Sequence, residues 1–265
     1  MVKLRMANFL FSERHMMTLH STLKTALGAL ALILLAQQAQ AAIALDRTRV
    51  VFNGSQRSTT LTISNQNTTL PYLAQAWIED AKGTKVESPL STLPPVQRVE
   101  PGAKGQIKVQ PTGNLSSLPQ DRETLFYFNV REIPPKSDKP NTLQLALQTR
   151  IKMFYRPQAI ELHRGEESEA QKKITLTRQG DGYQLNNPTP YYVTIVTAAA
   201  SQKGAEIASF KPVMVEPKGS ISLGISASAL GSQPVLAFIN DFGGRPKLVF
   251  SCSNSTCSVS SVIAG

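Results

Sequence analysis

Residues 141–157, which read NTLQLALQTRIKMFYRP, constrain the fold more than any other stretch of this chain. Leucines alternate with other residues at the start of the stretch, and a period of two is typical of a β-strand with one apolar face. Its second half carries Arg150, Lys152 and Arg156, so the same strand would have a cationic end. We therefore predict a long strand that could pair edge-on with another chain and bind a carboxylate of that chain.

The first 41 residues have the layout of a secretory signal peptide. Basic residues precede the apolar run 23–36, and Ala39-Gln40-Ala41 forms a small-x-small cleavage site. The run is short and rich in alanine for a membrane span, so an uncleaved anchor is the weaker alternative. Met16 and Met17 are alternative starts that would each give a more compact signal. We predict residues 1–41 as a signal peptide.

Cleavage after Ala41 would leave 224 residues, which suits two domains of about a hundred residues each. The full chain has a net charge of +10, and the removed segment carries +3 of it, so the exported part keeps +7. For a basic protein outside the cytoplasm, acidic peptides, carboxylates or anionic lipids are the expected partners. We predict no nucleic-acid partner and no stable membrane insertion.

The histidine and cysteine content argues against enzyme chemistry. Only His163 lies outside the predicted signal, and we expect it to be a solvated linker residue. Hydrolytic triads usually need a histidine base, and zinc sites usually need several histidine or cysteine ligands. We therefore predict no catalytic residue, no metal and no cofactor. Cys252 and Cys257 indicate a disulfide in an exported protein, with half a metal site as the alternative.

Short strand-like runs separated by turn residues recur along the rest of the chain, and this spacing predicts an all-β fold of antiparallel sandwiches. The runs cover 49–52, 61–63, 72–79, 107–109, 125–133, 174–176, 191–197, 221–225, 235–239 and 247–252. A charged stretch at 161–173 separates two halves of similar style. We predict an N-terminal domain at 42–160 and a C-terminal domain at 161–265.

Several longer motifs resemble those of the periplasmic pilus (fimbrial) chaperones and follow one another in the same order as in that family. They are ALDRTRV (44–50), LPYLAQAW (70–77), PQDRE (119–123), NVREIPP (129–135), FYRP (154–157) and NDFGGRP (240–246). The resemblance extends from about residue 42 to residue 259. Its short loop at 132–141, stiffened by Pro134, Pro135 and Pro140, is similar to the subgroup that serves rod-like pili.

The resemblance implies two immunoglobulin-like β-sandwich domains in an L-shaped arrangement with a cleft between them. Members of this family act in the periplasm without ATP and bind incompletely folded pilus subunits. A subunit lacks its last strand, and the chaperone lends one of its own, so that backbone pairing and alternate side chains fill the groove. The subunit then passes to an outer-membrane usher. A pilus subunit and the usher are thus the partners that the resemblance implies.

By the same resemblance, the lent strand inserts Leu143, Leu145 and Leu147. The alternative is that these leucines face the core of their own domain, as half-buried strands normally require. If they are exposed, self-association is expected, which includes a dimer that caps the strand. Lys152 and Arg49 would bind the C-terminal carboxylate of the subunit. The alternative is two ordinary surface charges.

The resemblance also implies an ion network between the domains, formed by Glu123, Arg156 and Asp241. The alternative is that each of them pairs locally or with water. Lys152 has the opposite parity to Leu147, so a regular strand would place them on opposite faces. We therefore expect a bulge or a strong twist between them, with a misplaced strand prediction as the alternative. The competing function is a secreted structural or adhesive protein of the same sandwich type, which would need neither a cationic cleft nor an exposed leucine row. A secreted hydrolase is a further alternative.

Overall fold

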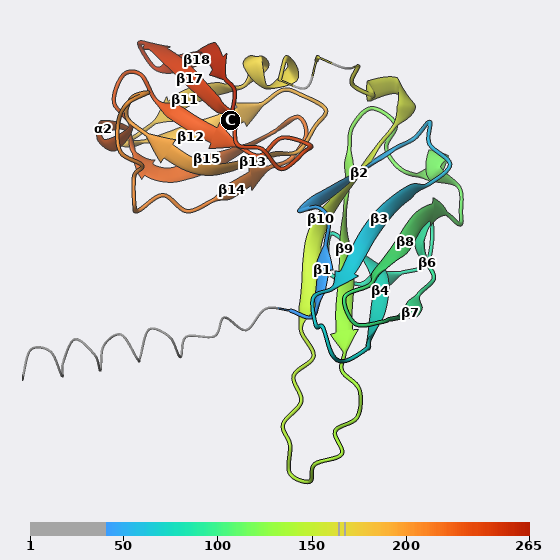
Figure 1. Cartoon of the computed structure of the whole chain (residues 1–265). Helices are drawn as coiled ribbons and strands as arrows, with labels where there is room; N and C mark the ends of the chain where they lie inside the picture. Colours follow the sequence, from blue (N-terminus) through green and yellow to red (C-terminus); the bar gives the residue numbers. More distant parts are fainter. Residues whose placement is uncertain (1–40, 164, 167) are drawn as a thin grey trace, which may run out of the picture. The chain divides into compact units, whose positions relative to one another are not determined.

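The computed structural model describes residues 41–163, 165–166 and 168–265 (Figure 1). The predicted signal peptide lies outside the described residues, apart from Ala41. Every strand-like run predicted from the sequence overlaps an observed strand, and the all-β prediction is confirmed. In the described part of the chain, no helix is long and apolar enough to cross a membrane.

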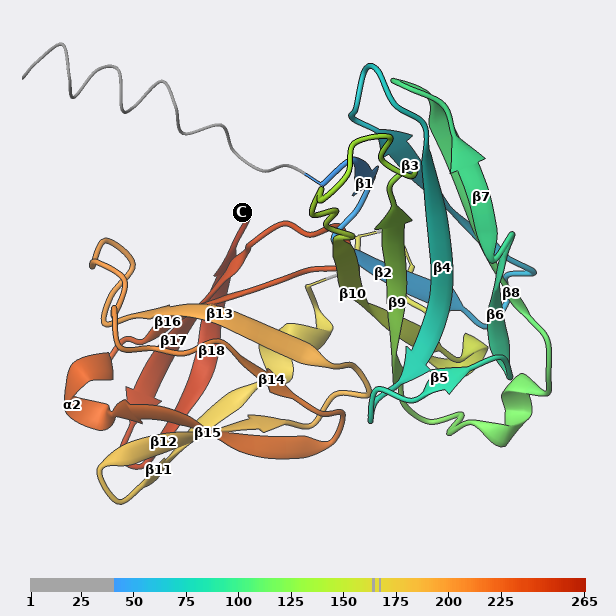
Figure 2. The same cartoon turned by 90° about the horizontal axis from the view of Figure 1, so that it is seen from below.

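The first half of the chain, the N-terminal sandwich, contains ten strands in two sheets. They are β1 (Ile43–Leu45), β2 (Arg49–Asn53), β3 (Thr59–Asn65), β4 (Tyr72–Asp80), β5 (Lys85–Val86), β6 (Leu90–Leu93), β7 (Val96–Val99), β8 (Lys104–Pro111), β9 (Thr124–Ile133) and β10 (Gln148–Arg156), with the 3-10 helix η1 (Leu115–Ser117) between β8 and β9. One sheet has the order β1-β3-β8-β6, and the other has the order β2-β10-β9-β4-β5, with β7 also paired to β4 (Figure 2).

Alternation along the strands builds the core of this sandwich. In β4, Ala74, Ala76 and Ile78 are buried, whereas Gln75 and the other intervening side chains face outward. The inward residues of both sheets meet in one cluster that includes the fully buried Phe52 and Phe128. Burial of each such large side chain stabilises the fold by roughly 1.5–3 kcal/mol.

The chain changes sheets between β1 and β2. Strand β1 pairs antiparallel with β3, whereas β2 pairs parallel with β10, from Arg49 opposite Lys152 to Asn53 opposite Arg156. Strand β10 also pairs with β9 from Gln148 to Tyr155. Among the described strands, β10 therefore has a neighbour on both sides only from Lys152 onward.

The second half of the chain, the C-terminal sandwich, forms one eight-stranded sheet in the order β14-β13-β16-β17-β18-β11-β12-β15. Its strands are β11 (Thr175–Gln179), β12 (Gly182–Asn187), β13 (Val193–Ala199), β14 (Val213–Val215), β15 (Gly219–Ser226), β16 (Val235–Phe238), β17 (Lys247–Ser253) and β18 (Thr256–Ile263). The short helices are η2 (Gln158–Ile160) and η3 (Ala170–Lys173) in the connection and α2 (Ala227–Leu230). The sheet surrounds a separate core that includes Phe238 and Phe250.

The predicted long strand over 141–157 is wrong in its first half. The observed strand β10 begins at Gln148, and the three leucines precede it in an irregular segment that joins β9 to β10 (Figure 1). The segment ends where Glu132 N donates a hydrogen bond to Leu147 O at 3.0 Å. The alternation of side chains shows only which residues could share a face. A strand also needs hydrogen-bond partners for its backbone, and no described strand lies beside residues 143–147.

Candidate functional site

The three leucines are exposed to solvent, so the alternative that they face their own core is wrong. Leu143 is 83% exposed, Leu145 is 67% exposed and Leu147 is 40% exposed. The segment is held to its own loop by local contacts, among them a hydrogen bond from Gln144 Nε2 to Pro135 O. An apolar row without cover beside the start of a strand is the kind of surface that another chain covers.

An edge of β10 that no described strand covers follows directly after this row. Residues 148–151 pair with β9 on one side, and β2 begins only at the level of Lys152 on the other side. The reason is the departure of β1 to the opposite sheet, where Ile43 N also donates to the buried Glu132 Oε2 at 2.9 Å. The backbone of β10 over 148–151 can therefore accept an incoming strand.

The expected bulge between the leucines and Lys152 is absent from β10, whose pairing with β9 is regular from Gln148 to Tyr155. Met153 and Tyr155 point into the core, in phase with Leu147. Lys152, Phe154 and Arg156 therefore occupy the opposite face. A regular extension of β10 to Leu147 would therefore place that side chain on the face opposite to Lys152, but β10 begins at Gln148 and the leucines lie outside it.

Arg49 and Lys152 lie directly opposite each other on the parallel strands β2 and β10. Opposed residues of a parallel pair project to the same side of the sheet, so the two cations share one face. Arg49 Nη1 donates to Ile239 O at 3.0 Å, and Lys152 Nζ donates to Thr194 Oγ1 at 3.3 Å. Among the described residues, no carboxylate forms a salt bridge with either cation.

The environment of this pair disfavours positive charge. Burial lowers the pKa of the Arg49 guanidinium, although the charges of Asp241 and Glu123 oppose the effect. Burial, followed by the charge of Arg49, lowers the pKa of the Lys152 ammonium. A carboxylate placed between them would relieve both effects, because it supplies the missing counter-charge and accepts from both groups.

Arg156 contacts both acidic residues of the third predicted set. Its Nε and Nη2 donate to Glu123 Oε1 at 2.9 and 2.7 Å, and its Nη1 donates to Asp241 Oδ2 at 2.7 Å. The second oxygen of Glu123 accepts from Tyr192 N at 2.7 Å. Burial raises the pKa of Glu123 to about 7, against the opposing charge of Arg156. These bonds join Glu123, which immediately precedes β9, and Arg156 of β10 to the segment before β13 and to the turn after β16.

Sequence reasoning missed a polar and aromatic surface on the outer face of β4, β9 and β10. The Arg150 guanidinium lies 3.4 Å from the centre of the Tyr127 ring, and its Nε donates to Glu79 Oε2 at 2.8 Å. Trp77 Nε1 donates to the same carboxylate at 2.9 Å. The alternation of outward residues on three strands was the available signal, but the pairing register that brings them together is long-range.

Cys252 and Cys257 form a disulfide across the β17–β18 hairpin, where they are paired residues. The disulfide prediction is confirmed, and the metal alternative is wrong for this pair. In the described part of the chain, no group of three or more histidine, cysteine or acidic residues is arranged to bind a metal ion. His163 is exposed in the connection between the sandwiches.

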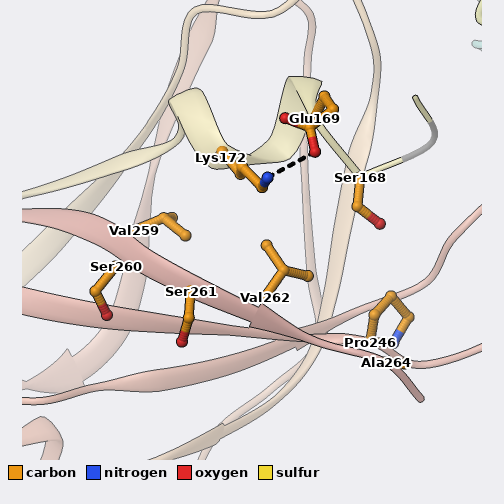
Figure 3. Close-up of a pocket in the computed structure, with 9 residues that line it drawn as sticks. All are labelled: Ser168, Glu169, Lys172, Pro246, Val259, Ser260, Ser261, Val262 and Ala264. Carbon is orange, nitrogen blue, oxygen red and sulfur yellow. Dashed lines mark hydrogen bonds and ion pairs between the residues drawn. The ribbon is translucent and has the colours of Figure 1, made fainter. Parts of the chain in front are cut away.

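An open pocket of ≈ 520 Å³ lies in the C-terminal sandwich, between η3 and the end of β18 (Figure 3). Serine hydroxyls and the side chains of Val259 and Val262 line it, together with Lys172, which donates to Glu169 at 2.6 Å. Both ionic groups at this pocket are already paired. The pocket is separate from Arg49, Lys152 and the leucine row, none of which lines it.

Comparison with known proteins identifies the family. The family model described as the pili and flagellar-assembly chaperone PapD N-terminal domain matches residues 42–161, and the model for the pili assembly chaperone PapD C-terminal domain matches residues 169–250. A probable fimbrial chaperone, YfcS of Escherichia coli K12, is 51% identical over 88% of this chain and 93% of its own length.

The chaperone protein PapD of Escherichia coli is 52% identical over 83% of this chain and 91% of its own length. The crystal structure of the periplasmic chaperone SfaE matches with a TM-score of 0.64 and 31% identity, over 78% of this chain and 98% of that chain. These likenesses favour the chaperone over the structural or adhesive alternative. The chain belongs to the PapD family of pilus-assembly chaperones.

Proposed function

We propose that this chain is a periplasmic, non-enzymatic chaperone that binds pilus subunits by lending them residues 143–147 as a strand. The groove of the subunit would be filled by Leu143, Leu145 and Leu147. The backbone of the subunit strand that pairs with this segment would continue along the open edge of β10. The observation that carries the proposal is the continuity of an exposed leucine row with a half-paired strand. Neither feature is stable against aggregation unless another chain covers it.

Arg49 and Lys152 would bind the C-terminus of the subunit strand. A subunit strand that runs along β10 toward Lys152 would reach Arg49 and Lys152 with its terminal carboxylate. The absence of a described salt-bridge partner for either cation supports this assignment, as does the lowering of both pKa values. Charge-assisted bonds to a terminal carboxylate would fix the register of the complex, because the chain end can occupy only one position.

The ion network would fix the orientation of one sandwich relative to the other; its members are Glu123, Arg156 and Asp241. The residues that form the carboxylate-binding site would then keep their positions. Arg49 and Lys152 each bond to an atom of the C-terminal sandwich, Ile239 O and Thr194 Oγ1 respectively. A change in the relative orientation of the sandwiches would therefore displace the side chains of Arg49 and Lys152. We place the domain boundary at residues 160–165, between an N-terminal domain at 42–160 and a C-terminal domain at 161–265.

The remaining features of the proposal follow the family. Residues 1–41 would be removed during export to the periplasm, and the loaded chaperone would deliver its subunit to an outer-membrane usher. The segment between the end of β9 and the leucine row is short, at residues 134–142, and it supports a place in the subgroup that serves rod-like pili. In the absence of a subunit, a second copy of the chain could cover the leucine row, which gives a dimer that competes with subunit binding.

Co-expression with a pilus subunit from the same host tests this function. Wild-type chain should keep the subunit soluble in the periplasm and copurify with it, whereas the double variant Arg49→Ala, Lys152→Ala should lose both effects. The double variant Lys104→Ala, Lys108→Ala is the matched control, because it removes two exposed cations of β8 at a different sheet. Equal copurification with all three proteins would refute the anchor, and no copurification with the folded wild type would refute the chaperone role.

A further inference from the structure

A small cavity lies behind the anchor residue Arg49. Its lining includes Arg49 and Phe154 from the N-terminal sandwich, Gln171 from η3, and the carboxyl-bearing residues Glu123 and Asp241. The volume open to a water-sized sphere is ≈ 10 Å³, which is about the space that one water molecule needs. The cavity is too small for a carboxylate ligand, so it cannot itself be the site that receives the subunit.

Two buried polar atoms on residues that line this cavity lack a hydrogen-bond partner within the described part of the chain. They are Arg49 Nε, a donor, and Gln171 Oε1, an acceptor. Both residues are 8% exposed, so bulk water does not satisfy these atoms. Buried polar groups in folded proteins are nearly always bonded to protein or to ordered water. The two atoms have complementary needs, since one must donate and the other must accept.

We propose that one water molecule binds in this cavity, accepts a hydrogen bond from Arg49 Nε and donates one to Gln171 Oε1. Glu123 and Asp241 also line the cavity, and a carboxylate oxygen of either residue would be the acceptor for the second hydrogen of the water. A buried water typically makes about three hydrogen bonds, which this set supplies. The site thus has both the polarity and the size that a bound water requires.

The bound water gives Gln171 a positioning role. Arg49 Nη1 is already held by Ile239 O, and the water would hold Nε on the same guanidinium. With two of its donors fixed, the planar group can present its remaining donors in one orientation only. This consequence rests on the proposed function, in which Arg49 receives the carboxylate of the subunit. Gln171 would act on that carboxylate through water and Arg49, without touching it.

A crystal structure of the mature chain tests the water itself. We expect electron density for one ordered water within hydrogen-bond distance of Arg49 Nε and Gln171 Oε1. Absence of that density, or a direct protein partner for either atom, would overturn the proposal. This result does not depend on subunit binding, so it separates failure of the water site from failure of the proposed function.

Binding of a synthetic peptide with the C-terminal sequence of a pilus subunit tests the positioning role. The ratio of affinities for the free-carboxylate peptide and its C-terminal amide isolates the anchor from the rest of the interface. Gln171→Met keeps the length of the side chain but removes its acceptor, and it should lower that ratio several-fold and remove the water density. Gln158→Leu, at an exposed glutamine of η2, is the control and should leave the ratio unchanged.

Thermal unfolding of each variant shows whether it is folded at the temperature of the binding assay. An unchanged ratio in folded Gln171→Met would overturn the positioning role, even with the water present in the wild type. A ratio near one in the wild type would refute the anchor and, with it, the positioning role, whereas the water would stand on the crystallographic result.

Discussion

Lys152 of β10 stands directly opposite Arg49 of β2, at the point where the second neighbour of β10 begins. The cationic pair therefore marks the boundary between the paired part of the strand and its open edge. An incoming strand can extend along 148–151 but meets β2 at Lys152. The chain end of that strand would arrive beside the two cations, which is where a terminal carboxylate is best received.

Carboxylate binding should weaken as the pH rises into the alkaline range. Burial and the charge of Arg49 lower the pKa of Lys152 in the free protein, and a bound carboxylate would raise it again. Affinity is therefore full below the lowered pKa and falls as the pH rises through it, because a neutral amine no longer attracts the anion. Titration of the free-carboxylate peptide at several pH values measures this fall.

Lys152→Met is the control for this pH dependence, and it should bind weakly with little change over the same range. The same slope in Lys152→Met and in the wild type would assign the dependence to another group. The amidated peptide, which carries no terminal charge, should show no such slope with either protein.

Leu145→Ser should weaken the complex with a subunit but leave the free protein almost unchanged. Burial of a leucine contributes roughly 1.5–3 kcal/mol, so the affinity should fall by about 10- to 100-fold. Because Leu145 is 67% exposed in the free chain, the free energy of unfolding should change by no more than about 0.5 kcal/mol. Titration with a whole subunit and urea denaturation of the free chain give the two values.

Leu93→Ser is the matched control, since Leu93 is 51% exposed at the end of β6, in the other sheet. It should leave subunit affinity unchanged. A large loss of stability in free Leu145→Ser would mean that the leucine belongs to the core of its own domain.

Arg156→Ala should destabilise the chain by about 3–5 kcal/mol, the usual cost of leaving a buried charge without its partner. The Glu123 side chain is 1% exposed and would lose its only described cationic contact. Asp241→Asn should cost far less, because the side chain of Asp241 is 27% exposed and Arg156 would keep Glu123. Denaturant unfolding at neutral pH gives both values.

The loss in Arg156→Ala should shrink as the pH falls. Burial already raises the pKa of Glu123 to about 7 with Arg156 present, and removal of the cation raises it further. A carboxyl whose pKa is higher in the folded state stabilises that state below its unfolded pKa, and this contribution is lost as the pH rises through the folded pKa. If the difference in free energy of unfolding between the wild type and Arg156→Ala grew as the pH fell, this explanation would be wrong.

Removal of the disulfide should lower the stability of the chain without loss of the fold. Cys252 and Cys257 close a short loop, for which the chain-entropy relation gives a contribution of about 2 kcal/mol. The double variant Cys252→Ala, Cys257→Ala should therefore unfold at lower urea concentration with the same dependence on denaturant. A change in that dependence would instead indicate altered folding of the β17–β18 hairpin.

Several parts of the site were predictable because they depend on local patterns. The alternation of Leu143, Leu145 and Leu147 identified a row of apolar side chains, all of which are exposed, and the close spacing of Cys252 and Cys257 identified the disulfide. The order of the motifs identified the family. The leucines and the cysteines are near neighbours in the sequence. The family was identified from the order of several short motifs.

Other parts depended on pairing between distant segments. The start of β10 at Gln148 could not be predicted from the alternation, since strand formation requires a backbone partner, and no described strand lies beside the leucine segment. The contact of Arg150 with Tyr127 and Glu79 follows from the register of three strands. The expected bulge before Lys152 arose from the assumption that the leucines and the cations belong to one regular strand, whereas β10 begins only at Gln148.

By itself, the sequence determined the all-β class, the leucine row, the disulfide and the family, because side-chain periodicity and motif order are properties of short segments. Only the tertiary structure decided that β1 leaves the sheet of β10, that Arg49 and Lys152 face each other, and that the leucines lie uncovered. These features depend on which backbone groups remain unpaired and which charges meet after distant strands have packed. Hydrogen bonding between strands is long-range, so no local pattern specifies where it stops.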